Sequence, residues 1–131
     1  MFIDASAIVA ILSWEDGVDA LNTQLSVADQ RFTSAIAIFE STMALMRKFK
    51  YDLPRAEAML MRFLEEANIQ ITPIQEAESH AALMAHHRYG KGRHPAALNM
   101  GDCFAYACAR SRDLPLLFKG DDFSKTDIAP A

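Results

Sequence analysis

The stretch from residue 99 to residue 123 constrains the fold more than any other part of the chain. It predicts an alanine-rich helix over Asn99–Ser111, followed by a short apolar strand at Leu116–Phe118. Asp102 lies in the first turn of that helix, and the acidic pair Asp121–Asp122 follows the strand. Carboxylates on both sides of a helix–strand corner can form half of a metal site with oxygen ligands. The rest of the chain would have to supply the other half.

Short apolar strands and longer helices alternate along the whole sequence. We expect strands at residues 1–3, 31–33, 69–71 and 116–118, with a further edge strand at 126–128. We expect helices at residues 5–13, 15–24, 35–50, 53 onward, 74–89 and 99–111, with a loop at 90–98. This alternation predicts a single α/β domain over residues 1–131, with a short, mostly parallel central sheet flanked by helices.

Apolar spacing also indicates which helix faces are buried. In the helix at 35–50 the apolar face consists of Ile36, Phe39, Met43 and Met46. In the helix at 74–89 we place Leu83 and Met84 on the side that faces the core.

The composition restricts the class of protein. With 131 residues, 51% of them hydrophobic and 23% charged, the chain has the make-up of one globular domain. No apolar run approaches the roughly 20 residues that a membrane-spanning helix needs, and the first residues lack the basic segment of a signal peptide. Cys103 and Cys108 fit reduced core residues better than a disulfide or zinc ligands. We therefore expect a cytoplasmic protein that does not contact a membrane.

The formal net charge of -4 argues against a strongly basic nucleic-acid binder. The distribution of charge matters more than its sum, and positive side chains gather at residues 47–50 and 88–94. A cation bound among the acidic residues would cancel negative charge where a phosphate has to approach.

Two of the candidate acidic positions directly follow predicted strands. Asp4 follows the first strand, and Asp121 and Asp122 follow the last. Functional groups of parallel sheets collect beyond the carboxyl ends of the strands, so we expect these carboxylates to lie close together. Structural roles are the alternative: Asp4 also suits the N-cap of the next helix, and the acidic pair after Gly120 also suits a polar turn.

The other two candidates lie in helices. Glu40 falls beside the apolar face of the helix at 35–50, where an ionised carboxylate is costly unless it is paired or bound to a metal. A salt bridge to Arg47, or a side chain that reaches past the core edge into solvent, would satisfy it equally well. Asp102 shares its helix face with two alanines, which leave room for an ion. It would also suit the positive end of the helix dipole.

Four separated carboxylates form a donor set that suits Mg²⁺ or Mn²⁺, because these ions prefer oxygen ligands. Without a cation, clustered carboxylates repel one another and are driven toward protonation. Metal binding should therefore weaken in acid.

Four passages of the chain resemble PIN-domain ribonucleases, specifically the VapC-type toxins of toxin–antitoxin pairs. They are FIDASAIVAIL at 2–12, SAIAIFE at 34–40, YGKGRHPAALNMGDCFAYACA at 89–109 and LPLLFKGDDFSKTDI at 114–128. The resemblance covers essentially the whole chain. It implies a PIN fold and a nuclease that uses Mg²⁺ or Mn²⁺ to hydrolyse RNA. Attack by water would leave a 5′-phosphate and a 3′-hydroxyl.

The resemblance also implies roles for individual residues. Asp4, Glu40 and Asp102 correspond to the three principal acids of the family, and Ser6 corresponds to the small hydroxyl residue that follows the first of them. Together with a fourth acid, the implied catalytic set is Asp4, Glu40, Asp102 and Asp122.

The fourth acid departs from the family pattern. Many relatives carry it where this chain has Gly120, so Asp121 or Asp122 must take the role, and we favour Asp122 because it precedes Phe123. The implied direct metal ligands are Asp4, Asp102 and Asp122. The residues that would act through water or through another ligand are Ser6, Glu40 and Asp121.

The resemblance further implies partners. Lys91, Arg93 and His94 lie in the loop before the Asp102 helix, where they would either bind RNA phosphates or simply face solvent. A VapB-type antitoxin would hold the protein inactive, and a homodimer is also implied. We expect these protein contacts on the apolar faces of the helices at 5–13 and 34–50.

Two other functions remain open on the sequence. One is a metal-independent ribonuclease that uses His94, or the His86–His87 region, with the ribose 2′-hydroxyl as nucleophile; it would resist EDTA and yield cyclic phosphates. The other is a non-catalytic module that binds RNA or a protein on the same fold.

Overall fold

Four parallel strands form the central sheet of the computed structural model, which describes residues 1–131. They are β1 (Phe2–Ile3), β2 (Arg31–Ser34), β3 (Ile69–Thr72) and β4 (Leu116–Leu117), and they lie in the order β3-β2-β1-β4. The register pairs Phe2 with Leu116 and Ile3 with Leu117. Asp4 is therefore the first residue beyond the carboxyl end of β1, beside the segment that leaves β4.

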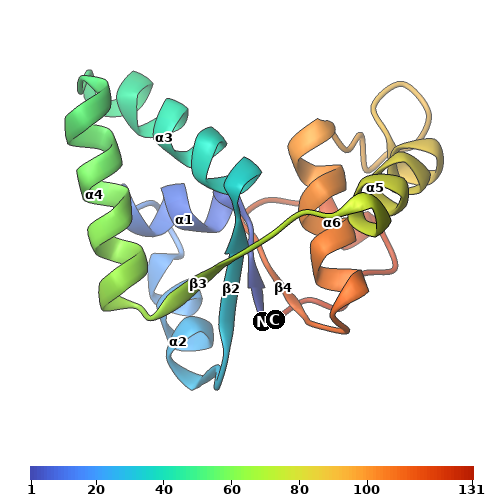
Figure 1. The fold of residues 1–131 in the computed structure, drawn as a ribbon, viewed down its shortest axis with the longest axis horizontal. Helices are drawn as coiled ribbons and strands as arrows, with labels where there is room; N and C mark the ends of the chain where they lie inside the picture. The colour runs from blue at the N-terminus through green and yellow to red at the C-terminus, as the bar shows by residue number, and fades with distance from the viewer.

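Six α-helices cover the two faces of this sheet. They are α1 (Ala5–Leu12), α2 (Val18–Val27), α3 (Ala35–Phe49), α4 (Leu53–Glu66), α5 (Glu76–Tyr89) and α6 (Met100–Ser111), and a short 3-10 helix, η1 (Phe123–Lys125), follows β4. Figure 1 shows α1 to α4 on one side of the sheet and α5 with α6 on the other. The predicted α/β class is confirmed.

The topology explains why the helices divide in this way. From β1 to β3 the chain adds each strand on the same side of the previous one, whereas β4 returns to the free side of β1. Because crossover connections between parallel strands keep one hand, a reversal in direction puts the connecting helices on the opposite face. The order of the strands therefore separates α5 and α6 from the other helices.

Neighbouring residues of one strand pack into two separate hydrophobic cores. Phe2 and Leu116 pack among α5 and α6, whereas Ile3 and Leu117 pack among α1, α2 and α4. Successive strand side chains point to opposite faces, so two-residue strands are enough to anchor both layers.

The prediction for the apolar face of α3 is wrong for Phe39 and Met43, although Met46 does pack against the core beneath this helix. Its buried side chains include Ala37, Ser41 and Leu45, whereas Phe39 is 68% exposed and Met43 is 36% exposed. Small residues face inward because α1 packs directly against α3, and a close helix contact has no room for large side chains. Phe39 and Met43 are left on the outer surface of the helix.

The predicted inner face of α5 is also wrong. Leu83 is 69% exposed and Met84 is 48% exposed. The side that faces the core contains Ala82, Ala85 and Tyr89, because α5 lies closely along α6.

The last residues do not form the predicted edge strand at 126–128. The chain instead forms η1, and Pro130 then makes an isolated bridge to Leu116. The Tyr106 hydroxyl donates to a carboxylate oxygen of Asp127 at 2.6 Å, which draws this segment toward α6 and away from the sheet.

Glu78 connects α5 to the end of α6. Its carboxylate accepts a hydrogen bond from the backbone N–H of Gln75 at 3.0 Å, and others from Ser111 Oγ and Arg112 Nη1, each at 3.0 Å. The same guanidinium donates to the carbonyl of Pro73 at 3.1 Å. These contacts hold the far end of the helix that carries Asp102.

The cysteines behave as the sequence predicted. Cys103 and Cys108 are buried and unpaired, and burial raises the pKa of each thiol to about 11. None of the helices combines the length and the apolar character that crossing a bilayer would require.

Candidate active site

The candidate site lies where the direction of the sheet reverses. β1 and β4 are neighbours, yet the helices next to them in the chain lie on opposite faces of the sheet. In open α/β sheets, ligands bind at such a point, beyond the carboxyl ends of the strands. Figure 1 shows α3 and α6 on either side of this edge. The backbone N–H of Asp4 donates to the carbonyl of Leu117 at 2.9 Å, which fixes the start of α1 against the end of β4.

Asp4 is buried, with 3% of its surface exposed. Its Oδ2 accepts hydrogen bonds from the backbone N–H of Ser6 at 2.9 Å and from Ser6 Oγ at 2.5 Å. Asp4 is thus the N-cap of α1, which is the structural role that the sequence offered as an alternative for this residue. Burial raises the pKa of its carboxyl group, against the lowering effect of the bonds from Ser6, and the charge of Asp122 raises it further.

Ser6 connects Asp4 to the segment beyond β4. Its Oγ accepts a hydrogen bond from the backbone N–H of Lys119 at 3.0 Å while it donates to Asp4. The hydroxyl proton is therefore directed at the carboxylate. The sequence did not point to Lys119, because it contributes its backbone rather than its side chain.

Asp102 is the third residue of α6 and forms a capping box with Asn99. Asp102 Oδ2 accepts from the backbone N–H of Asn99 at 2.8 Å, and Asn99 Oδ1 accepts from the backbone N–H of Asp102 at 3.0 Å. Burial raises the pKa of Asp102 to about 6; the bond from Asn99 opposes this shift, and the charges of Asp4 and Asp122 add to it.

Glu40 is half-buried in α3 and faces the other acids. Burial raises its pKa to about 7, and the negative charges of Asp4 and Asp102 contribute to the increase. The ion pairs of the structure do not include a bridge from Glu40 to Arg47. Its carboxylate lies instead against the backbone of Gly101, a contact that no sequence pattern indicated.

Asp121 and Asp122 are both exposed but differ in their electrostatic effect. The charge of Asp122 acts on Asp4 and on Asp102, whereas Asp121 has no such effect on either. The carbonyl of Asp121 accepts a hydrogen bond from Ser124 Oγ at 2.5 Å within the turn. Asp122 is therefore the member of the pair whose charge acts on the other acids of the site.

The donor set fits a hard divalent cation. Every candidate group is a carboxylate oxygen, which is the ligand type that Mg²⁺ and Mn²⁺ prefer. Three of the carboxyl groups have raised pKa values, which a nearby cation would lower. In this conformation no three acidic, histidine or cysteine side chains converge closely enough to hold a metal ion. The carboxylates of Asp4 and Asp102 instead accept backbone hydrogen bonds at the N-termini of α1 and α6.

A groove of about 630 Å³ opens beside Glu40, between α1 and α3. Its apolar lining includes Val9, Phe39 and Met43, and its basic lining is Arg47 and Lys119. The groove therefore leads from the acidic residues along the outer surface of α3.

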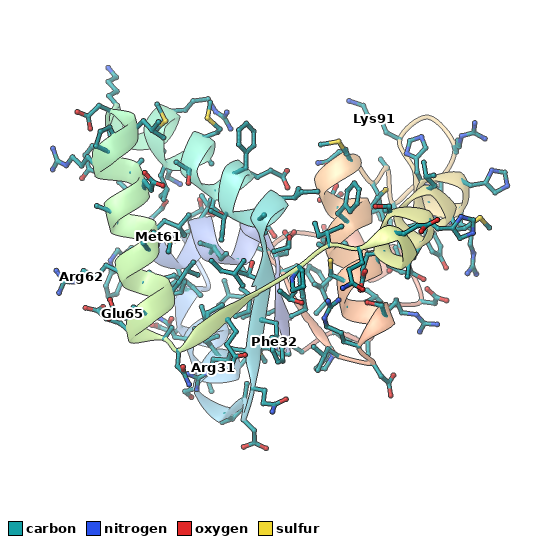
Figure 2. The ribbon with its side chains drawn as sticks, in the orientation of Figure 1. Arg31, Phe32, Met61, Arg62, Glu65 and Lys91 are labelled. Carbon is teal, nitrogen blue, oxygen red and sulfur yellow. The ribbon has the colours of Figure 1, made fainter.

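The three basic loop residues have different surroundings. Lys91 and Arg93 are exposed, and Figure 2 shows Lys91 extending away from the sheet, on the side of the molecule where α6 begins. His94 is half-buried: its Nδ1 accepts from the backbone N–H of Ala96 at 3.1 Å, and its ring packs edge-on against Tyr89 at 5.2 Å. These contacts show that His94 stabilises the loop, and its Nδ1 is already used as an acceptor. Both facts argue against His94 as an acid or base in a metal-independent mechanism.

Replacing Glu40 by Gln should stabilise the protein at neutral pH. Because the pKa of Glu40 is about 7 when folded and near its usual 4.5 when unfolded, the folded state holds the extra proton between these values. The free energy of unfolding therefore falls as pH rises through this range. The variant should gain about 1–2 kcal/mol near pH 8, allowing for partial exposure, and nothing near pH 4.

Thermal unfolding without metal, measured across this pH range, tests the expectation. Glu57→Gln, an exposed change on α4, is the control. Equal melting temperatures for wild type and Glu40→Gln at the higher pH would contradict the electrostatic account of the site.

Comparison with known proteins identifies the family of the chain. The model of the PIN domain matches residues 1–129. The chain is 39% identical over 132 residues to VapC ribonuclease Mb2780c of Mycobacterium bovis, covering 100% of this chain and 98% of the relative. It is 41% identical over 139 residues to VapC ribonuclease R02377 of Rhizobium meliloti, covering 97% of this chain and 98% of the relative.

Solved structures show the same fold at much lower identity. The crystal structure of Mycobacterium tuberculosis VapC20, a toxin that cleaves the sarcin–ricin loop, has a TM-score of 0.77 at 15% identity and covers 99% of this chain and 97% of its own. A toxin–antitoxin complex from Klebsiella pneumoniae contains a chain with a TM-score of 0.69 at 16% identity, covering 96% of this chain and 92% of its own. The chain therefore belongs to the PIN-domain family, and within it to the VapC ribonucleases.

Proposed function

We propose that this protein is an endoribonuclease that depends on Mg²⁺ or Mn²⁺ and hydrolyses RNA phosphodiester bonds, as a VapC-type toxin. One observation carries the proposal: carboxylates from the ends of β1 and β4 and from α3 and α6 are close enough to act on one another's pKa. The full-length relatives, which are named ribonucleases, support the same activity.

The acids divide into three roles in this proposal. Asp4, Asp102 and Asp122 would hold the divalent cation. When bound, such a cation stabilises charge on the phosphate and lowers the pKa of water. Glu40 would orient the attacking water by accepting a hydrogen bond from it, since its half-buried carboxylate faces Asp4 and Asp102.

Ser6 would keep Asp4 in a productive orientation. Its hydroxyl proton is committed to Asp4 by the bond that it accepts from the Lys119 backbone. Asp121 is retained only as an outer residue that acts through water. The domain that carries this activity would comprise residues 1–131.

The RNA would reach the acids along positively charged surfaces. Lys91 and Arg93 are exposed on the loop that precedes α6, and Arg47 and Lys119 line the groove beside Glu40. These cations would contact phosphates and so fix the position of the strand. His94 would contribute mainly by shaping the loop. With RNA as the substrate, the activity belongs in the cytoplasm.

Cleavage of RNA by the purified protein tests the proposal. We expect cleavage with Mn²⁺ or Mg²⁺, loss of cleavage in EDTA, and products that carry a 5′-phosphate and a 3′-hydroxyl. Asp102→Asn should reduce the rate by about 10²-fold or more, because a charged oxygen is lost from the site. Asp113→Asn, at the other end of α6, should cleave like wild type.

The alternatives give different results in the same assay. Cleavage that persists in EDTA and yields cyclic phosphates would favour the histidine mechanism. RNA binding without cleavage under any metal condition would favour a non-catalytic module.

The salt dependence of RNA binding tests the basic loop. In an Asp102→Asn background, Lys91→Ala combined with Arg93→Ala should weaken binding of a single-stranded RNA at low salt. The slope of log K against log salt should become shallower by about 1.4, since each phosphate contact contributes about 0.7. An unchanged slope would remove this loop from the interface.

A matched control removes two cations elsewhere. Arg55 and Arg62 lie on α4, and Figure 2 places Arg62 at the opposite end of the molecule from Lys91. Replacing both by Ala should leave the slope unchanged.

The same proposal includes a VapB-type antitoxin and a homodimer. A chain of similar fold occurs in the Klebsiella pneumoniae toxin–antitoxin complex. The groove between α1 and α3, with Phe39 and Met43 exposed on its wall, offers an apolar surface for an antitoxin segment that would also cover Glu40. The exposed apolar residues of these two helices are our candidates for contacts with a second copy as well.

A further inference from the structure

The crossing of α3 and α6 brings the carboxylate of Glu40 into the place where a side chain of residue 101 would begin. A Cβ atom added to Gly101 would lie 1.9 Å from Glu40 Oε1 and 2.3 Å from both Cδ and Oε2. Real Cβ atoms essentially never come within 3.0 Å of a heavy atom of a residue that is distant in the chain. The Glu40 carboxylate therefore occupies the space that a side chain at position 101 would need.

The backbone gives no other reason for glycine at this position. Gly101 lies in the first turn of α6, and it is absent from the residues with positive φ, which among the glycines are Gly17, Gly92 and Gly120. Glycine lowers the stability of a helix relative to alanine. The close approach of Glu40 is thus the structural requirement that alanine would not meet.

We propose that Gly101 is a positioning residue, which by lacking a side chain admits the Glu40 carboxylate to the acidic cluster of Asp4 and Asp102. The inference rests on the proposed nuclease function, in which Glu40 orients the attacking water. It adds a residue that contacts neither RNA nor metal but decides where Glu40 stands.

Alanine at this position would displace Glu40 without breaking the fold. The atoms that conflict with the new Cβ belong to the end of a flexible side chain, so they can withdraw by more than about 1 Å while α3 and α6 stay in place. The groove beside Glu40, lined by Arg47 and Lys119, offers a position for the displaced carboxylate. A misplacement of this size in a catalytic group can cost about 10²-fold in rate.

A double-mutant cycle between residues 101 and 40 tests the proposal. The proteins are wild type, Gly101→Ala, Glu40→Asp and the combination of both. Met100→Ala, an exposed change in the same helical turn, is the control. Each is measured for kcat and KM on a single-stranded RNA with Mn²⁺, for Mn²⁺ affinity by calorimetry, and for melting temperature without metal.

We expect Gly101→Ala to lower kcat by about 10²-fold with little change in KM, and Met100→Ala to have no effect on either. Aspartate is one methylene shorter and does not reach the place of the new Cβ. In the Glu40→Asp background, Gly101→Ala should therefore cause no further loss of kcat. Gly101→Ala should also raise the melting temperature more in the Glu40→Asp background than in wild type. Alanine stabilises the helix in both backgrounds, but its Cβ conflicts with the carboxylate of residue 40 only when that residue is glutamate.

Two results would overturn the proposal. One is wild-type kcat for Gly101→Ala; the other is a set of losses that simply add in the double variant. If Gly101→Ala does not fold, the proposal requires the double variant to fold, because Glu40→Asp removes the conflict with the new Cβ. A double variant that also fails to fold would refute the proposal.

The melting temperatures separate this inference from the proposed function. If wild type neither cleaves RNA nor binds Mn²⁺, the proposed function fails, while the metal-free cycle still reports on the contact. An equal effect of Gly101→Ala on the melting temperature in both backgrounds would then refute the positioning role by itself.

Discussion

Burial of carboxylates at the edge of the sheet, together with their mutual repulsion, is the main electrostatic cost of this structure. Asp4 is buried, and Asp102 and Glu40 are partly buried, so each is costly to ionise, and the charge of one raises the pKa of the next. Such a group of acids disperses unless the fold holds it in place. Local contacts hold each acid in place: Ser6 donates two hydrogen bonds to Asp4, Asp102 forms a capping box with Asn99, and Glu40 lies against the backbone of Gly101. The raised pKa values of these acids show that holding them together lowers the stability of the ionised protein.

The strand order brings these devices together. Because β4 returns to pair with β1, the ends of the first and last strands become neighbours although more than a hundred residues separate them. The two layers of helices then approach this edge from opposite faces, α3 with Glu40 from one and α6 with Asp102 from the other. Two-residue strands suffice, since alternate side chains anchor them in both cores. The site thus belongs to the topology as much as to any single element.

The sequence predicted the elements well and the packing less well. Periodicity and capping residues placed the helices and strands, because these depend on neighbours in the chain. They failed for Phe39, Met43, Leu83 and Met84, which are exposed because close helix contacts select small residues, a requirement that only the tertiary structure reveals. Asp4 and Asp122 lie near enough for the charge of Asp122 to raise the pKa of Asp4, which agrees with the expectation from the strand ends. The roles of Lys119 and Gly101 could not be predicted, since a backbone donor and a missing side chain leave no pattern in one sequence.

In the proposed function these carboxylates bind a divalent cation and release protons as they do so. Calorimetric titration of the protein with Mn²⁺ between about pH 5 and pH 8, in buffers of different ionisation enthalpy, tests it most directly. Since the pKa of Glu40 is about 7 and that of Asp102 about 6, Mn²⁺ affinity should fall steadily as the pH drops through this range, with protons released on binding. An affinity that is independent of pH, with no proton release, would contradict the account.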